Sequence, residues 1–307
     1  MNMNDTCMLC PRACRSRRSE GERGACGETS AIRLARAALH FWEEPCISGK
    51  RGSGAVFFTG CQLRCVYCQN RPIAHGDVGR EVSVSRLTDI FFELKEQGAN
   101  NINLVTPDHF IPQIAEAIGA ARAKGFSLPF VYNTGSYVTV EALRMLDGLI
   151  DIYLPDLKYL DEARAGAYSG APDYPQVAKA ALQEMYRQTG AVRFQRIPGE
   201  PEPMLRRGMV VRHLLLPGAL DDAKRIVVYL YDTFGDRIYL SLMSQYTPGA
   251  AVAGHPVLRR RVRRKDYEAL VDEAIRIGVE NAFIQEGSAA DESFIPAFDY
   301  EGVEEVR

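Results

Sequence analysis

Cysteine is missing from most of this 307-residue chain: all eight cysteines lie in the first 68 residues, and the remaining 239 (307 minus 68) contain none. A disulfide-stabilised domain would spread its cysteines through the fold, and a reducing cytosol would not keep them oxidised. Clustered thiols in such a chain indicate metal ligands instead. The sequence therefore predicts metal binding that is confined to its N-terminal part.

The chain also lacks long apolar runs and a strong net charge. No apolar stretch approaches the roughly 20 residues that span a bilayer, and the N-terminal stretch MNMNDTCMLCPRACRSRR has no apolar signal-peptide core. A net charge of -2 and a pI near 6.3 give no overall attraction to nucleic acid or to an anionic membrane. We expect a cytoplasmic enzyme with neither of these partners.

From about residue 54, short apolar runs alternate with helical stretches. The run AVFFTG predicts a buried strand, and SVSRLTDIFFELKEQG predicts a helix because its apolar residues recur at i, i+3, i+4 and i+7 from Leu87. Repeated strand–helix alternation predicts parallel strands with right-handed crossovers. The expected fold class is α/β, a full or partial (β/α) barrel, with an open doubly wound sheet as the alternative.

The same patterns place the other elements. We expect strands in NINLVTP, LPFVYNTG, LIDIYLPDLK, VRFQRI, MVVRHLLLPG, RIYLSLMSQ and VENAFIQ, and helices in IPQIAEAIGAARAKG and at 139–147, 175–189, 219–234 and 266–277. Residues 1–48 are expected to form a small Cys-rich N-terminal metal-binding segment, and residues 49–307 the barrel domain. From about residue 286 a polar tail is expected to extend along the surface.

Cys61, Cys65 and Cys68 follow the first barrel strand, at its carboxyl end, where (β/α) barrels bind ligands. A C-x3-C-x2-C loop can bind three corners of a 4Fe–4S cluster and leave the fourth iron open to a small molecule. The alternatives are a zinc site completed by a distant residue, and three thiols without a metal.

A second set of cysteines has the spacing C-x2-C-x3-C-x11-C, and its members are Cys7, Cys10, Cys14 and Cys26. Four thiolates complete a tetrahedral site, and a metal would supply folding energy to a segment too short and polar for its own core. Zinc and an auxiliary 4Fe–4S cluster both satisfy this pattern. Cys46 remains; we expect a buried apolar residue, with ligation of the N-terminal site as the alternative.

The triad, with Tyr67 just before its last cysteine, resembles the signature of the radical S-adenosylmethionine (radical SAM) superfamily. GCQLRCVYCQN is similar in particular to the pyruvate formate-lyase activating enzymes, and LHFWEEPCISGKRGSGAVFFTGC and CMLCPRAC resemble activating-enzyme-like iron–sulfur proteins. The resemblance extends from Cys7 through SLMSQYTP. It implies a radical SAM barrel and an oxidoreductase in which S-adenosylmethionine chelates the open iron. One electron then cleaves it to methionine and a 5′-deoxyadenosyl radical that abstracts hydrogen.

The resemblance also implies contacts to the cofactor. DLKYLD is similar to a D-x-K motif whose residues contact S-adenosylmethionine, which assigns Asp156 and Lys158, with Lys158 pairing the methionyl carboxylate. VVRHLLLPG implies a cofactor contact for Arg212, and YNTGS places Asn133 near the ribose. The alternatives are a rim ion pair for Asp156 and Lys158 and a turn for Asn133.

One string departs from the family pattern. Activating enzymes have Gly-Gly-Glu after the second strand, where this chain has NLVTPDHF. We expect Thr106 and the backbone around Pro107 to substitute, with Asp108 as an acidic partner for the cofactor's amino group. His109 is expected to cap or pack, with catalysis as the alternative. No catalytic side chain is identified.

The sequence is compatible with three functions. The first is activation of a glycyl radical protein, the second is radical modification of a small molecule or peptide, and the third is a zinc-stabilised binding module without catalysis. The expected electron donor is a flavodoxin or a ferredoxin-type protein. The basic run from Arg259 to Lys265 would suit docking of an acidic protein, with a solvated loop as the alternative.

Overall fold

The structure, a computed structural model, describes residues 6–285 and 296–304. Within these ranges ten strands belong to one sheet, in the order β10-β9-β8-β6-β5-β4-β2-β1-β3, with β7 beside β8. The strands are β1 Ile32–His40, β2 Ser53–Phe58, β3 Arg80–Val82, β4 Ile102–Val105, β5 Phe130–Thr134, β6 Ile152–Pro155, β7 Arg193–Gln195, β8 Met204–Leu214, β9 Tyr239–Met243 and β10 Ala282–Ile284.

Nine α-helices are present in the same ranges. They are α1 Pro45–Ser48, α2 Arg71–Ala74, α3 Val84–Glu96, α4 Ile111–Ala123, α5 Val140–Arg144, α6 Glu162–Ser169, α7 Tyr174–Thr189, α8 Leu220–Phe234 and α9 Arg264–Ile277. Short 3-10 turns occur at Arg18–Glu20, Asp108–Phe110, Gly235–Arg237 and Ala250–Val252. None of the described helices has the length and hydropathy that crossing a bilayer requires.

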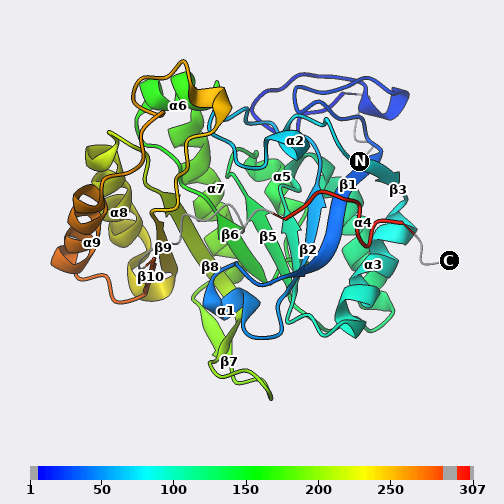
Figure 1. Ribbon diagram of the computed structural model, residues 1–307. Helices are drawn as coiled ribbons and strands as arrows, with labels where there is room; N and C mark the ends of the chain where they lie inside the picture. The colour runs from blue at the N-terminus through cyan, green and yellow to red at the C-terminus, as the bar shows by residue number, and fades with distance from the viewer. Residues whose placement is uncertain (1–5, 286–295, 305–307) are drawn as a thin grey trace.

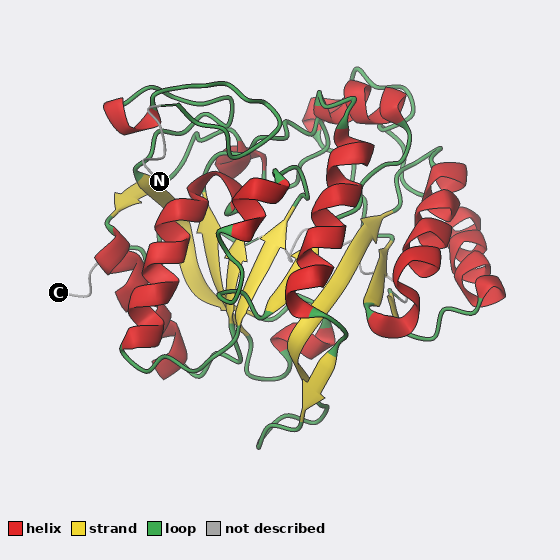
Figure 2. Cartoon of the chain, turned by 180° about the vertical axis from the view of Figure 1, so that it is seen from behind, coloured by secondary structure: helices red, strands yellow, loops and turns green. Residues whose placement is uncertain are grey.

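The sheet is mostly parallel. β2, β4, β5, β6, β8, β9 and β10 pair in parallel with their neighbours, whereas β1 is antiparallel to both β2 and β3. Helices cover the outer face of the curved sheet (Figure 2). Because β10 and β3 are the two ends of the strand order, the barrel is partial. The predicted α/β class is confirmed, and the sheet forms a partial barrel (Figure 2), not the doubly wound sheet named as the alternative.

The parallel strands end on one side of the molecule. Figure 1 shows that the N-terminal segment, α2 and α6 lie on this side, whereas α1 and β7 lie on the opposite side. At that opposite side Cys46 and Ile47 of α1 are buried against Val131, Leu154 and Val210 of the sheet. Helix α1 therefore closes the lower end of the barrel with apolar side chains, and Cys46 is buried there as predicted.

Four features differ from the sequence-based expectations. Strand β1 lies before the predicted boundary at residue 48 and yet pairs with β2 in the sheet. VRFQRI forms β7, whose residues are all exposed and which pairs antiparallel with β8, so it is a hairpin outside the barrel. Helix α6 had no clear apolar periodicity and was missed. The polar tail lies partly outside the described residues, but Val303 is buried, and Tyr300 N–H donates to Ala35 O of β1.

Candidate active site

A cavity of about 490 Å³ opens at the carboxyl ends of the parallel strands. It is lined by eight of the residues predicted for cluster or cofactor contact, but not by Asp108: Cys61, Cys65, Cys68, Thr106, Asn133, Asp156, Lys158 and Arg212. These positions come from the ends of β2, β4, β5, β6 and β8 and the loops that follow them. The carboxyl ends of the parallel strands therefore bring together residues that lie far apart in the sequence, as predicted.

The cysteine loop is folded tightly against the end of β2. Gly60 has φ +82°, and a Cβ there would lie 2.4 Å from Glu28 Cγ, so this turn requires glycine. Burial raises the pKa of the Cys61 thiol well above its ordinary value, and the nearby Cys65 and Cys68 thiols raise it further. The three sulfur atoms thus lie close enough to interact electrostatically.

The triad is not arranged as a single-ion site. Among the described residues, no group of three His, Cys, Asp or Glu side chains is placed to hold one metal ion. A zinc ion needs all its thiolates about 2.3 Å from one point, whereas a cubane cluster takes one cysteine at each of three iron corners. Three separate thiols around one cavity suit the cluster.

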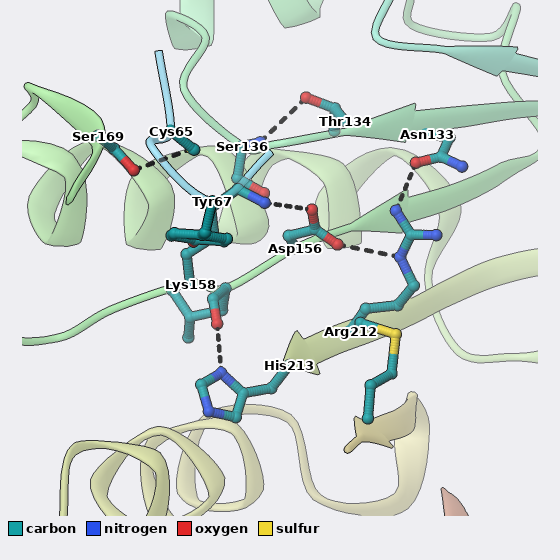
Figure 3. Close-up of polar contacts among 12 residues, drawn as sticks. Cys65, Tyr67, Asn133, Thr134, Ser136, Asp156, Lys158, Ser169, Arg212 and His213 are labelled. Carbon is teal, nitrogen blue, oxygen red and sulfur yellow. Dashed lines mark hydrogen bonds and ion pairs between the residues drawn. The ribbon is translucent and has the colours of Figure 1, made fainter. Parts of the chain in front are cut away.

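Buried charges form a chain across the cavity floor. Lys158 Nζ lies 2.6 Å from Asp156 Oδ2, and Arg212 Nε lies 3.0 Å from Asp156 Oδ1. Arg212 also donates to Asn133 Oδ1 at 2.5 Å (Figure 3). Burial acts to raise the pKa of Asp156, but Arg212 and Lys158 bring it below its ordinary value, so the carboxylate is ionised.

The chain of charges ends at a residue that sequence reasoning missed. Arg212 Nη1 lies 3.2 Å from Glu43 Oε2, and Glu43 accepts from Asn103 Nδ2 at 2.9 Å. The neighbouring Glu44 also lines the cavity. Their only sequence signal is a pair of adjacent glutamates just before Pro45.

Part of the chain matches the model of a known protein family. Residues 55–189 match the model of the Radical SAM superfamily. These residues form a radical SAM domain. Such a domain implies a 4Fe–4S cluster and S-adenosylmethionine as cofactors.

A similar protein extends beyond the radical SAM domain. The chain is 23% identical over 286 residues to an uncharacterized protein of Methanocaldococcus jannaschii, MJ0674, covering 91% of this chain and 77% of that protein. The match therefore includes the N-terminal cysteines or the C-terminal strands, or both, because it is longer than the domain.

The solved structure of anSMEcpe shows the same fold at low identity. The chain is 10% identical to anSMEcpe, solved with bound AdoMet and a Kp18Cys peptide, with a TM-score of 0.50 and coverage of 71% of this chain and 57% of that one. It is 13% identical to SuiB of Streptococcus suis, with a TM-score of 0.49 and coverage of 78% and 49%. The chain thus spans about half the length of these solved proteins.

Around the cysteines of the radical SAM domain, hydroxyl groups form a hydrogen-bonded series. Cys65 Sγ lies 2.9 Å from Ser169 Oγ (Figure 3). Ser169 Oγ lies 2.9 Å from Tyr159 OH, and Tyr159 donates to Tyr67 OH at 2.6 Å. Ser169 is the last residue of α6, so the helix missed in the sequence supports a cysteine of the triad.

The string that replaces Gly-Gly-Glu has an unusual backbone. Thr106 has φ +57°, a left-handed conformation that a β-branched residue rarely adopts, and it lines the cavity directly after β4. Asp108 does not line the cavity: it is buried and accepts from Thr134 Oγ at 2.5 Å and from Tyr132 OH at 3.1 Å. The expectation that Asp108 faces the cofactor is therefore not supported by its position.

His109 is a packing residue. Its ring is buried, with Nε2 against Thr59 O, and its own carbonyl oxygen accepts from Arg18 Nη1 at 2.6 Å. Burial, together with the Arg18 charge, lowers the pKa of His109 to about 3, so the ring is neutral. His109 joins the N-terminal segment to the start of the cysteine loop.

The four N-terminal cysteines gather beside the domain. Burial raises the pKa of Cys10 to about 12, and the neighbouring Cys7, Cys26 and Cys14 thiols add to the rise. Cys61 N–H donates to Cys26 O at 3.2 Å, which links the two cysteine sets directly. The choice between zinc and a cluster at this second set stays a prediction.

The basic run is exposed. Arg259, Arg260 and Arg261 face solvent, whereas Arg263 pairs with Asp266 at 2.8 Å and Arg264 with Glu268 at 2.7 Å. Two of the run's cations are therefore engaged within their own helix, α9, and its N-cap.

Proposed function

We propose that this protein binds a 4Fe–4S cluster through Cys61, Cys65 and Cys68 and uses S-adenosylmethionine to abstract hydrogen from a separate protein substrate. The observation that carries the proposal is the meeting of the three thiols and the buried Lys158–Asp156–Arg212 chain in one cavity. When bound, the two cofactors together supply one-electron chemistry that ends in hydrogen-atom abstraction.

The chain's own residues bind and orient the cofactor. Lys158 provides the cation for the methionyl carboxylate, and Asp156 holds its ammonium in place. Arg212 donates to Asn133 Oδ1, and Asn133 Nδ2 donates to Glu43 Oε1 at 3.3 Å, so both partners fix the amide near the ribose. Thr106, with its left-handed backbone, takes the place of the missing glycine pair beside the amino group.

A polypeptide substrate is supported by the shape of the entrance. A second hollow of about 340 Å³ shares Trp42, Glu43, Pro45, Gln245 and Gln285 with the main cavity. Phe41 is 48% exposed and Trp42 61% exposed at this hollow. Exposed aromatic side chains at a concave surface are typical of polypeptide recognition. We propose a glycyl radical protein as the substrate, and a peptide of another class as the second candidate because of the Kp18Cys peptide bound to anSMEcpe.

The basic run is proposed as the docking site for an acidic electron donor, a flavodoxin or a ferredoxin-type protein. The loop before it reaches the cysteine loop: Tyr246 and Tyr67 have ring centroids 6.3 Å apart, and His255 packs edge-on against Tyr168, 6.2 Å between centroids. Tyr168 O in turn accepts from Val66 N–H at 2.8 Å. An electron donor bound to Arg259–Arg261 would therefore lie on the side of the triad.

The test is anaerobic reconstitution followed by three measurements. We expect four irons and four sulfides at the triad, dithionite-dependent release of 5′-deoxyadenosine, and a glycyl radical signal by electron paramagnetic resonance when a candidate partner protein is added. Iron-free protein that binds only zinc would support the non-catalytic module instead. Release of 5′-deoxyadenosine with a peptide, without a glycyl radical, would select the second candidate.

The donor is tested separately. Replacing Arg259, Arg260 and Arg261 by glutamate should lower the rate with reduced flavodoxin at least tenfold and leave the dithionite-dependent rate unchanged. Equal rates with flavodoxin would remove the basic run from electron transfer.

A further inference from the structure

One carboxylate in the cavity has no cation of its own. In the buried chain, Lys158 and Arg212 are balanced by Asp156 and Glu43. Glu44 forms no ion pair with any residue in the described part of the chain. Burial raises the pKa of its carboxyl group, and Arg212, which acts in the opposite direction, is already paired with Asp156 and Glu43. The cavity lining therefore holds one more carboxyl group than it has cations to pair with.

The Glu44 side chain is 92% buried, since only 8% of the residue is exposed, and it lines the cavity. Its Oε2 atom is buried without a hydrogen-bond partner. A buried carboxylate that lacks a partner costs free energy. Such a group is retained where it serves a ligand, unless the fold itself uses it.

The fold makes no use of this carboxylate as a cap. Glu44 is the N-cap residue of α1, where a side chain ordinarily accepts from the first backbone amides, yet it makes no capping hydrogen bond. The backbone carbonyl of Glu44, not its side chain, accepts from Ile47 and Ser48. The hydroxyl group of Ser241 acts to lower the pKa of this carboxyl group, against the effect of burial.

The position of Glu44 separates it from the proposed cofactor contacts. Ser241 lies on β9 and is paired in register with Arg212 of β8. In the strand order β9 is five places from β2, whose end carries the cysteine loop. Glu44 thus lines a part of the cavity that is five strands away from the triad in the sheet.

The unpartnered polar atoms in this region are hydrogen-bond acceptors, so a ligand bound there would have to supply a hydrogen-bond donor. Besides Glu44 Oε2, Asn103 Oδ1 is buried without a partner; Asn103 does not line the cavity itself but donates to Glu43, which does. Both atoms only accept hydrogen bonds. With a single free oxygen, Glu44 does not present the paired acceptors that a guanidinium fork uses, whereas an ammonium group needs only one.

We propose that Glu44 binds a protonated primary amine of the substrate, such as a lysine side chain or a chain's amino terminus, and so orients the hydrogen donor in the cavity. The inference rests on the proposed function, because it assigns this part of the cavity to the substrate of the radical SAM domain. It adds the chemical class of the group that the cavity recognises.

The test is the thermal unfolding of the reconstituted protein, with S-adenosylmethionine saturating and n-butylammonium chloride as the probe. Sodium chloride at equal ionic strength and n-butanol are the reference solutes. We expect the wild-type Tm to rise by about 2–4 °C at ten times the probe's Kd, and n-butanol to have no such effect. Glu44→Gln should lose the response, and Glu141→Gln, at an exposed position of α5, should keep it.

A second readout needs no ligand. Because Glu44→Gln removes a buried carboxyl group that has no cation to pair with, its Tm without probe should equal or exceed that of the wild type. Glu44→Met, which has no polar end, should behave in the same way if the glutamine variant folds poorly. A probe response that persists in both variants, or a Tm that falls in both, would overturn the proposal.

These outcomes are independent of the proposed chemistry. Absence of 5′-deoxyadenosine from the wild-type protein, with the probe response intact, would contradict the proposed function alone. Normal 5′-deoxyadenosine release without any probe response would contradict the amine site alone.

Discussion

The two cysteine sets lie side by side and are built in different ways. The triad loop belongs to the barrel: Leu63 and Cys65 are buried in the main core, and Val66 is tied to Tyr168. The N-terminal set lies in turns held by two arginines, with Arg12 reaching Gln62 O, and Arg18 reaching His109 O. The barrel therefore holds the triad in place, whereas the N-terminal set is held by a few polar contacts, to which we predict that a metal adds.

The largest expected effect is at the triad. Cys61→Ala, Cys65→Ala or Cys68→Ala removes one corner of the cluster, and each should abolish dithionite-dependent release of 5′-deoxyadenosine. Cys46→Ala is the matched control, because Cys46 is buried in α1 away from both sets. Substantial 5′-deoxyadenosine from any triad variant would contradict the mechanism.

The N-terminal set should respond in a different way. Changing Cys7 and Cys10 together to alanine should remove one zinc or one cluster per chain and lower the Tm, because this segment lacks a core of its own. The triad cluster should keep its spectrum in the protein that stays folded. Metal analysis and thermal unfolding measure both effects, and unchanged metal content in the double variant would show that these thiols bind none.

The third prediction concerns the contact between Lys158 and S-adenosylmethionine. Lys158→Met keeps most of the packing of the stem and removes a charge-assisted contact, whose loss costs about 2–5 kcal/mol when the pair is desolvated. The affinity for S-adenosylmethionine should fall by roughly 30-fold or more, at 1.4 kcal/mol per factor of ten. Cluster content should not change. Titration of the cofactor against the reduced cluster by electron paramagnetic resonance tests this, and an unchanged Kd would remove Lys158 from the site.

The smallest expected effect is at the junction of the two sets. His109 has a pKa of about 3 when folded, below its ordinary value near 6.5, so the unfolded chain binds the proton more readily. The stability that a neutral His109 provides is therefore complete above pH 6.5 and is lost as the pH falls below it. The loss is about 1.4 kcal/mol per pH unit, or roughly 2 kcal/mol at pH 5.

His109→Gln isolates this contribution, because glutamine can donate to Thr59 O but does not titrate. The difference in unfolding free energy between wild type and variant should therefore change by roughly 2 kcal/mol between pH 7 and pH 5. A difference that is constant with pH would show that His109 is not the group concerned.

Local patterns in the sequence predicted the triad, the parallel strands and their polar ends. The cysteine spacing and the apolar period of α3 are properties of a few adjacent residues, and chain direction alone brings the ends of parallel strands together. Glu43 could not be predicted, because its partners Asn103 and Arg212 are 60 and 169 positions away. The antiparallel pairing of β1 was missed for another reason: its partner β2 is close along the chain, with His40 opposite Ser53, but no strand was expected in the Cys-rich segment.

Strand β7 shows the opposite error. Its alternating apolar residues resemble those of a buried strand, but whether a strand is covered depends on what packs over it. The structure leaves Arg193, Phe194 and Gln195 exposed. Periodicity indicates a strand; it does not indicate the sheet position that the strand occupies.

The hydrogen bonds of Arg12 have a consequence for how the chain is made. Arg12 donates to Ser169 O and Gly170 O, 157 and 158 positions further along, and Leu9 O accepts from Thr139 N–H. The N-terminal cysteines leave the ribosome before the residues that hold them, which emerge about 160 residues later. At about 5–20 residues per second, this interval is on the order of 10–30 seconds. During that time the thiols are open to oxidation and to the wrong metal, and so metal loading at this set is expected to follow synthesis of α6.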